Sequence, residues 1–141
     1  MTERYEFIVP IRPAGKARAR ITRGGRRTYT PTKTAQTEET IRLFAFSAGV
    51  RPIEGPVSLQ VDCLFEPPQS WSKKRRREAI EGACNHTRRP DADNVGKLVA
   101  DALSGIAYKD DAQVTELIVR KAYDAENRIE IEISSSIRRP A

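Results

Sequence analysis

Apolar and polar residues alternate along several stretches of the chain in the manner of half-buried strands. Residues 57–65 show this pattern most clearly, and residues 5–9, 114–123 and 128–134 are also rich in strand-forming side chains. Proline follows each of the first two stretches and stops it. The run 124–127 has the composition of a turn, so we expect the last two strands to form an antiparallel pair.

Helical spacing of apolar residues replaces this alternation in other parts of the chain. Residues 93–104 carry an apolar stripe at intervals of three and four, with Asp93 as the expected N-cap. A longer helix is expected from residue 31 or 32 up to the glycine at position 49. A short helix is expected within residues 70–82, capped by Ser70 or Ser72.

The order strand, helix, strand, short helix, helix, strand, strand predicts a two-layer α/β protein of the α+β kind. We expect one mixed sheet with helices packed on one side. The 141 residues suit a single domain over residues 1–141, which buries enough surface to fold without disulfides. Cys63 occupies an apolar position of a strand and Cys84 a loop, and their spacing is not that of a zinc site.

Basic residues outnumber acidic ones, which favours an anionic partner. The chain has 25 Lys and Arg against 19 Asp and Glu, a formal net charge of +6. Charge alone fits either nucleic acid or an anionic membrane surface. The sequence has no apolar run long enough to span a bilayer and no signal-peptide pattern. We therefore expect an intracellular, cytoplasmic protein that does not bind a membrane.

Arginine and lysine gather in two segments. Residues 7–37 contain no acidic residue, and residues 73–77 are all basic. Guanidinium groups hold phosphates through paired hydrogen bonds, so these segments predict contacts with a nucleic-acid backbone; a solvated surface is the alternative for each. The predicted DNA-binding residues are Lys16, Arg18, Arg20, Arg26, Arg27, Lys73, Lys74, Arg75, Arg88 and Arg89.

A pair of carboxylates precedes the clearest helix. Asp91 and Asp93 are two residues apart, so in an extended segment they point the same way. Neighbouring carboxylates repel each other unless a cation lies between them, and Mg²⁺ or Mn²⁺ prefers such oxygen ligands. Lys97 and Asp101 follow at helical spacing from Asp93 and share its face. The pair therefore predicts a metal site beside a lysine, suited to binding a phosphate.

A second acidic pair, Asp110 and Asp111, follows this helix. A tight return of the chain would bring one of them back beside Asp91 and Asp93, which would assemble a site for phosphodiester hydrolysis. The alternatives are structural, because Asp93 can serve only as a helix cap and the second pair only as turn residues. Lys97 and Asp101 can likewise form a simple ion pair on a solvated face.

These residues resemble the RusA family of Holliday-junction resolvases. The family pattern P-D-x-D-N, K, D-A-L and D-D-x-Q-[IV] is matched in order and spacing by residues 90–94, 97, 101–103 and 110–114. The stretches Ser70-Trp71-Ser72-Lys73-Lys74 and Gly15-Lys16-x-Arg18-x-Arg20 also look like phage and prophage members. Ala92 departs from the pattern, since a larger aliphatic residue is usual there, and the Asn-rich N-terminal variant of the family is absent.

The resemblance implies a homodimeric, Mg²⁺-dependent endonuclease, with Mn²⁺ as a substitute metal, that cuts four-way DNA junctions by symmetric paired nicks. Carried over to this chain, Asp91, Asp93 and Asp111 resemble the metal-binding and catalytic carboxylates, and Lys97 resembles the catalytic lysine. Spacing does not decide whether Asp110 joins or replaces Asp111. The competing hypothesis is a basic DNA- or RNA-binding module without catalysis, which leaves the acidic cluster without a purpose near phosphates.

Two further side chains remain open at this stage. Trp71 stands beside the basic run and is expected either to stack on a base or to pack in the core or an interface. His86 is the only histidine, and its alternatives are proton transfer near neutral pH, a phosphate contact, or no role.

Overall fold

The computed structural model describes residues 3–17, 20–21, 28–29 and 32–136. It confirms the predicted mixed α+β class, and each predicted strand and helix is present within a few residues. The elements are β1 (Arg4–Val9), β2 (Arg20–Ile21), β3 (Thr28–Tyr29), α1 (Thr32–Ser47), β4 (Val57–Phe65), α2 (Lys73–Ile80), α3 (Ala92–Leu103), the 3-10 helix η1 (Asp111–Gln113), β5 (Val114–Tyr123) and β6 (Arg128–Ser135).

The main sheet has the strand order β1-β6-β4-β5 and is mixed. Strand β6 pairs antiparallel with both β1 and β4, while β4 and β5 are parallel. The expected antiparallel pairing of the last two strands is therefore wrong, because β4 lies between β5 and β6. β5 and β6 run in opposite directions without sharing a ladder. Strands β2 and β3 form a separate small antiparallel hairpin.

The turn between β5 and β6 crosses the end of β4 and is bonded to it. The backbone N–H of Asp124 donates to the carbonyl of Phe65 at 2.9 Å. The backbone N–H of Glu66 donates to Oδ1 of Asn127 at 2.8 Å. These bonds satisfy the polar groups that β4 leaves at its end, which explains how a turn-like sequence serves as a bridge over a strand.

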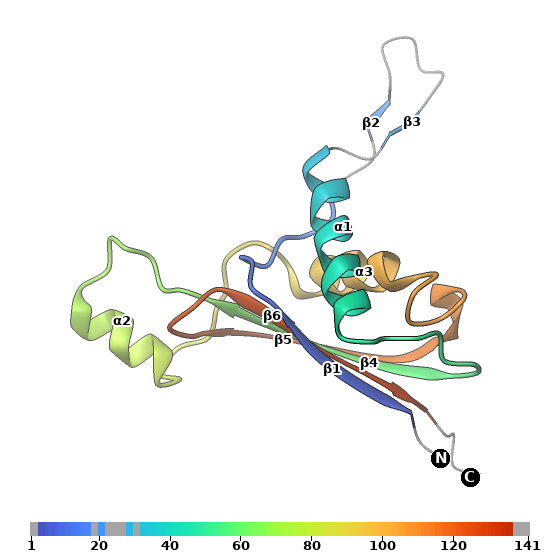
Figure 1. Ribbon diagram of the computed structural model, residues 1–141. Helices are drawn as coiled ribbons and strands as arrows, with labels where there is room; N and C mark the ends of the chain where they lie inside the picture. The colour runs from blue at the N-terminus through green and yellow to red at the C-terminus, as the bar shows by residue number, and fades with distance from the viewer. Residues whose placement is uncertain (1–2, 18–19, 22–27, 30–31, 137–141) are drawn as a thin grey trace.

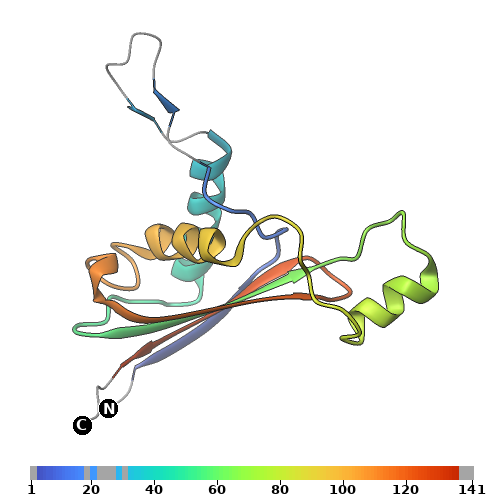
Figure 2. The same cartoon turned by 180° about the vertical axis from the view of Figure 1, so that it is seen from behind.

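Helices α1 and α3 cover one face of the main sheet, whereas α2 projects beyond one end of it (Figure 1). In the view from behind, no helix of the described chain lies on the other face (Figure 2). Alternation along β4 explains this layering, because its odd-numbered side chains are buried under the helices and its even-numbered ones are partly exposed. No helix in the described ranges is both long and apolar enough to cross a membrane.

Helix α3 packs its apolar stripe on the sheet as predicted. Its buried residues are Val95, Gly96, Leu98, Val99, Ala102 and Leu103. A Cβ on Gly96 would lie 2.7 Å from Cγ2 of Val119, so glycine allows α3 to approach β5 closely. The helix begins at Ala92, which places Asp91 in the N-cap position and Asp93 in the first turn. The expectation that Asp93 is the N-cap is therefore wrong.

Candidate functional site at the N-terminus of helix α3

A groove of about 840 Å³ runs between the segment after β1, helix α1 and the start of α3. Its charged lining residues are Arg12, Lys16, Lys33, Arg89 and Asp91. Four positive charges and one carboxylate make this groove suitable for a phosphate backbone that passes close to an acidic side chain.

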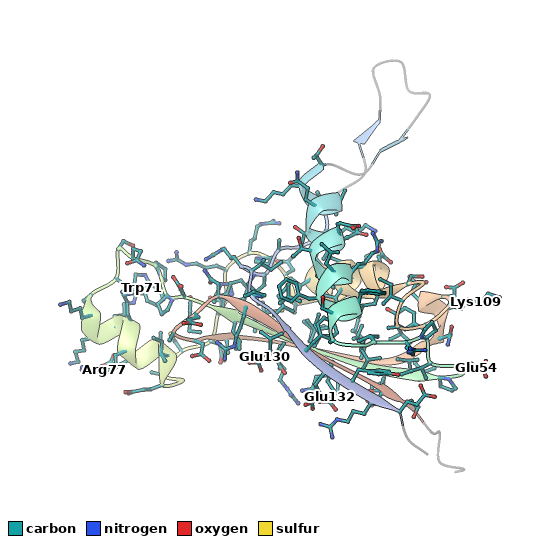
Figure 3. All side chains as sticks on the ribbon, in the orientation of Figure 1. Glu54, Trp71, Arg77, Lys109, Glu130 and Glu132 are labelled. Atoms are coloured by element: carbon teal, nitrogen blue, oxygen red, sulfur yellow. The ribbon has the colours of Figure 1, made fainter. Side chains whose placement is uncertain are left out.

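The opposite face of the sheet carries acidic side chains that are paired with arginines. A hollow of about 500 Å³ there is lined by Glu6, Asp62, Glu130 and Glu132. Figure 3 labels Glu130 and Glu132 on the side of the sheet away from the helices. Arg4, Arg120 and Arg128 form ion pairs with these carboxylates, so the hollow has no excess of positive charge for a phosphate backbone, and the groove beside α3 is the candidate site.

Both carboxylates at the start of α3 are exposed and available. Asp91 occupies the N-cap position, yet its side chain makes no capping hydrogen bond. Asp93 makes no hydrogen bond or ion pair with another described residue. Both lie at the N-terminal end of α3, where the helix dipole is positive. The structural alternative, in which such an aspartate serves only as a cap, is not what this helix displays.

The segment after β1 is held tightly against this helix start. A Cβ on Gly15 would lie 2.6 Å from Nδ2 of Asn94 and 3.3 Å from Cβ of Pro90. A larger residue at this position would require the Asn94 amide group to move aside. The packing explains why the G-K-x-R and P-D-x-D-N stretches occur together, since they form the two walls of one groove.

Lys121 anchors the loop that leads into Asp91, although it lies outside the motifs that predict the site. Its ammonium group donates to the backbone carbonyls of Arg88 at 2.8 Å and of Pro90 at 3.0 Å. The sequence carried a signal, because Lys121 alternates with Val119 and Tyr123 on the helix-covered face of β5, where an apolar residue is expected. A lysine at such a position needs partners, and the loop carbonyls supply them.

Lys16 pairs with an acid instead of standing free for DNA. Its ammonium forms an ion pair with Asp101, from the last turns of α3, and this hydrogen bond raises the pKa of Lys16. The alternative in which Lys97 and Asp101 form a simple ion pair does not hold among the described ion pairs, and Lys97 is exposed. Lys16 therefore closes the end of the groove by joining the N-terminal segment to α3.

The second acidic pair divides into a structural and an available carboxylate. Asp110 caps η1, accepting from the backbone N–H of Ala112 at 2.9 Å, and that bond lowers the pKa of Asp110. Asp111 is exposed, and hydrogen bonds with the carboxyl groups of Asp110 and then Asp101 raise its pKa. Asp110 thus has the structural role that was the alternative for this pair, while Asp111 lies beside the carboxyl groups of Asp110 and Asp101.

Gln113 and Tyr108 hold this return of the chain in place. The Gln113 amide donates to the carbonyls of Ile53 and Gly55, both at 2.9 Å. Its Oε1 accepts from the backbone N–H groups of Lys109 and Asp110. The buried Tyr108 hydroxyl donates to the carbonyl of Ala100 in α3. These bonds give the glutamine of the D-D-x-Q pattern its physical role.

The carboxylates of one chain do not close around a single point. Asp111 is next to Asp101, which is eight residues, or about 12 Å along a helix, from Asp93. In the part of the chain that the structure describes, no three Asp, Glu, His or Cys side chains converge to hold a metal ion. Mg²⁺ is nevertheless commonly held by one or two carboxylates with waters and a substrate phosphate, and exposed Asp91 and Asp93 fit that donor set.

The predicted DNA-binding residues fall into different settings. Lys73, Lys74 and Arg75 are exposed on α2, and Arg75 lies over the Trp71 ring at 3.7 Å from its centroid. Arg89 lines the groove, and Arg88 is exposed with its guanidinium 5.5 Å from the Trp71 centroid. The side chains of Arg18, Arg20, Arg26 and Arg27 lie outside the described residues.

Trp71 and His86 belong to one aromatic row. The His86 ring stacks on Phe65 with centroids 3.7 Å apart and planes 10° apart, and it lies 5.1 Å from the Tyr123 ring. Trp71 packs against Tyr123 at 5.4 Å. Burial, and then the charges of Lys121, Arg12 and Arg88, lower the pKa of His86 to about 4. The histidine is therefore neutral at pH 7, where it cannot act as a general acid.

The chain is similar in sequence to known proteins of one family. The model described as Endodeoxyribonuclease RusA matches residues 10–134, which include the groove, α3 and both acidic pairs. The uncharacterized protein YqaN of Bacillus subtilis (strain 168) is 38% identical over 124 residues, 84% of this chain and 86% of that protein. A crossover junction endodeoxyribonuclease rusA of Lactococcus phage r1t is 45% identical over 49 residues, 34% of this chain and 37% of that protein. The chain therefore belongs to the RusA family of endodeoxyribonucleases.

Proposed function

We propose that this protein is a divalent-metal-dependent resolvase that cuts four-way DNA junctions by symmetric paired nicks. The family acts on branched DNA, and the match covers most of this chain. The observation that carries the finer proposal is the state of Asp91 and Asp93. Both are exposed: Asp91 lines the basic groove, and Asp93 is two residues further on. Neither side chain makes a hydrogen bond or ion pair with another described residue. Unpaired carboxylates near bound phosphates repel them unless a cation lies between the two, so this placement favours a metal site.

Asp91 and Asp93 are the proposed main ligands of Mg²⁺, with Mn²⁺ as a substitute, and Asp111 is the proposed third carboxylate. When bound, such a metal supplies an activated water and neutralises charge on the phosphate oxygens. Asp110 is a weaker candidate, because its carboxylate already caps η1. Asp111 approaches a metal at Asp91 and Asp93 only if the acidic groups rearrange from their places beside Asp101.

Basic residues of the groove perform the binding and orientation. Arg89 and Lys33 line it and can hold phosphates on either side of Asp91. Lys97 follows Asp93 by one helical turn on the exposed side of α3, so its ammonium can stabilise negative charge that develops on the phosphate. The exposed lysines and arginine of α2 give a second contact for a DNA arm, at a distance from the groove (Figure 3).

A homodimer is part of the proposal, because two symmetric nicks require two sites related by a two-fold axis. The two strands cut in a four-way junction are equivalent by the symmetry of the substrate. A pair of identical chains reproduces that symmetry with one site each.

The test is cleavage of a labelled four-way junction and of a matched linear duplex, with Mg²⁺ or with a chelator. Wild-type protein is compared with Asp93→Asn and with Asp62→Asn, a matched control on the acidic, uncovered face. We expect paired nicks on the junction only, lost with the chelator and reduced at least about 100-fold by Asp93→Asn. The control variant should cut like wild type.

Two outcomes would overturn parts of this proposal. Junction binding without cleavage under every divalent metal would support the non-catalytic DNA-binding module instead. Cleavage that persists in chelator, or in Asp93→Asn protein, would remove the metal and its ligand from the mechanism.

A further inference from the structure

A second, smaller pocket lies beside the groove on the side toward α2. It has a volume of about 260 Å³, and its lining residues include Arg12, Gln69, His86, Arg88 and Tyr123. Arg12 lines both this pocket and the groove that contains Asp91, so the two are adjacent. Arg88 is three residues from Asp91, which is at most about 11 Å of chain. The volume of this pocket is slightly below the usual range for small-molecule sites, about 300–1,000 Å³.

The pocket combines aromatic surface with positive charge. His86 and Tyr123 lie in its wall, and His86 is backed by the parallel ring of Phe65. Arg12 and Arg88 are exposed at the pocket, and Glu66 is the one carboxylate among its lining residues. The two rings are more than nine-tenths buried and form the apolar floor of the pocket, while the exposed guanidinium groups of Arg12 and Arg88 can bind a phosphate. The Glu66 and Gln69 side chains offer hydrogen bonds to a base edge.

One polar group in this wall lacks a partner. His86 is 5% exposed, and its Nδ1 makes no hydrogen bond within the described part of the chain. A buried unpaired nitrogen costs free energy, and such groups often mark functional positions. A purely structural role for this ring would be served as well by phenylalanine, which has no polar atom to satisfy.

We propose that this pocket holds one unstacked nucleotide of the branched DNA, next to the strand that crosses the groove. The proposal rests on the proposed function, because only a branch point supplies a nucleotide that is easily removed from the stack. Bases beside a crossover lack part of their stacking, which lowers the cost of extrusion. Contacts with Arg12 would connect the extruded nucleotide to the phosphate placed near Asp91.

The experiment uses a four-way junction that carries 2-aminopurine at one position at a time on either side of the crossover. Fluorescence of this base rises when it leaves the stack. Asp93→Asn protein keeps the DNA uncut, and its binding is measured separately by anisotropy on the same junction and on linear duplex. We expect a fluorescence rise at one position on junction binding and none on duplex.

Filling the pocket should abolish this signal. Gln69→Trp, in the Asp93→Asn background, places a large ring in the pocket, and Ser70→Trp places the same ring on the next residue, outside the lining. We expect Gln69→Trp to remove the fluorescence rise and to weaken junction binding about 5- to 100-fold, while duplex binding is unchanged. Ser70→Trp should behave like its parent. Arg88→Gln, a smaller change at an exposed residue, should lower the signal in the same direction.

The outcomes separate this proposal from the one before it. Failure of Asp93→Asn protein to bind the junction would contradict the proposed function. Tight junction binding with no fluorescence change at any position would overturn the pocket alone. An unchanged fluorescence rise in both Gln69→Trp and Arg88→Gln would show that the nucleotide unstacks elsewhere, and would equally overturn it. A Gln69→Trp protein that does not fold leaves Arg88→Gln to decide.

Discussion

Lys121→Met is the change that tests how the fold positions Asp91. Methionine keeps the length and the apolar stem of the side chain and removes the ammonium group. The carbonyls of Arg88 and Pro90 then lose the donor that holds them at 2.8 and 3.0 Å. The loop between His86 and Asp91 loses its bond to the sheet, so Asp91 becomes less well fixed relative to the groove.

The magnitude follows from the setting of the two bonds. A hydrogen bond from a charged donor contributes about 1.5–3 kcal/mol to folding when its partners are otherwise unsatisfied. The bond to Pro90 is partly buried, whereas the bond to Arg88 is exposed and water can replace it. We therefore expect the free energy of unfolding to fall by about 2 kcal/mol, and not by the full sum. A displacement of about 1 Å at a catalytic group can cost about 100-fold in rate, so we expect junction cleavage to slow by about 10- to 100-fold.

Urea unfolding followed by circular dichroism measures the stability, and single-turnover cleavage of the four-way junction measures the rate. Lys109→Met is the matched control, because Lys109 is exposed and its ammonium makes no ion pair with the described residues. Junction affinity should change much less than the cleavage rate if Lys121 acts by positioning. Wild-type stability together with a wild-type cleavage rate in Lys121→Met would refute the anchoring role.

Two other predictions concern titration and the second acidic pair. Burial lowers the pKa of His86 from 6.5 to about 4, so the unfolded chain binds more protons than the folded one between these pH values. The free energy of unfolding should then fall as pH drops from 6.5 to 4, by about 3 kcal/mol in total, and His86→Phe should lack this component in urea titrations at several pH values. Equal pH dependence in both proteins would contradict the buried neutral state. Asp110→Ala should lower the urea midpoint, because it removes the cap of η1. Asp111→Asn should keep or raise the urea midpoint and lose cleavage of the junction. Urea unfolding and cleavage assays of both variants check this, and the opposite pattern would exclude Asp111 as the available carboxylate.

Local pattern was sufficient for the four strands of the main sheet and for the three α-helices. The alternation in β4 and the apolar stripe of α3 predicted both the elements and their buried sides, because a side chain's direction repeats with the period of its own backbone. The sequence predicts Asp93 as the N-cap of α3, whereas the N-cap is Asp91, two residues earlier. The pattern does not distinguish them, because two aspartates and an alanine are all acceptable near a helix start. The pairing between strands was less predictable, because β4 lies between β5 and β6 and the two do not form the expected hairpin.

The candidate site divides in the same way. The motif around Asp91 and Asp93 was visible in the sequence, because its chemistry resides in residues that are close along the chain. The pairing of Lys16 with Asp101 joins residues 85 positions apart, and nothing near either residue announces the other. The neutral state of His86 likewise arises from burial among Phe65 and Tyr123, which come from different strands.

Sequence alone thus determined the class of the fold, the excess positive charge and the acidic motif, all of which depend on composition or on short spacing. Tertiary packing determined which carboxylates are available. It assigned Asp110 to a cap, set Asp111 beside Asp101 and left Asp91 and Asp93 exposed at a basic groove. The physical reason is that hydrogen bonds, ion pairs and desolvation depend on distance in space, which chain folding sets and short-range spacing does not.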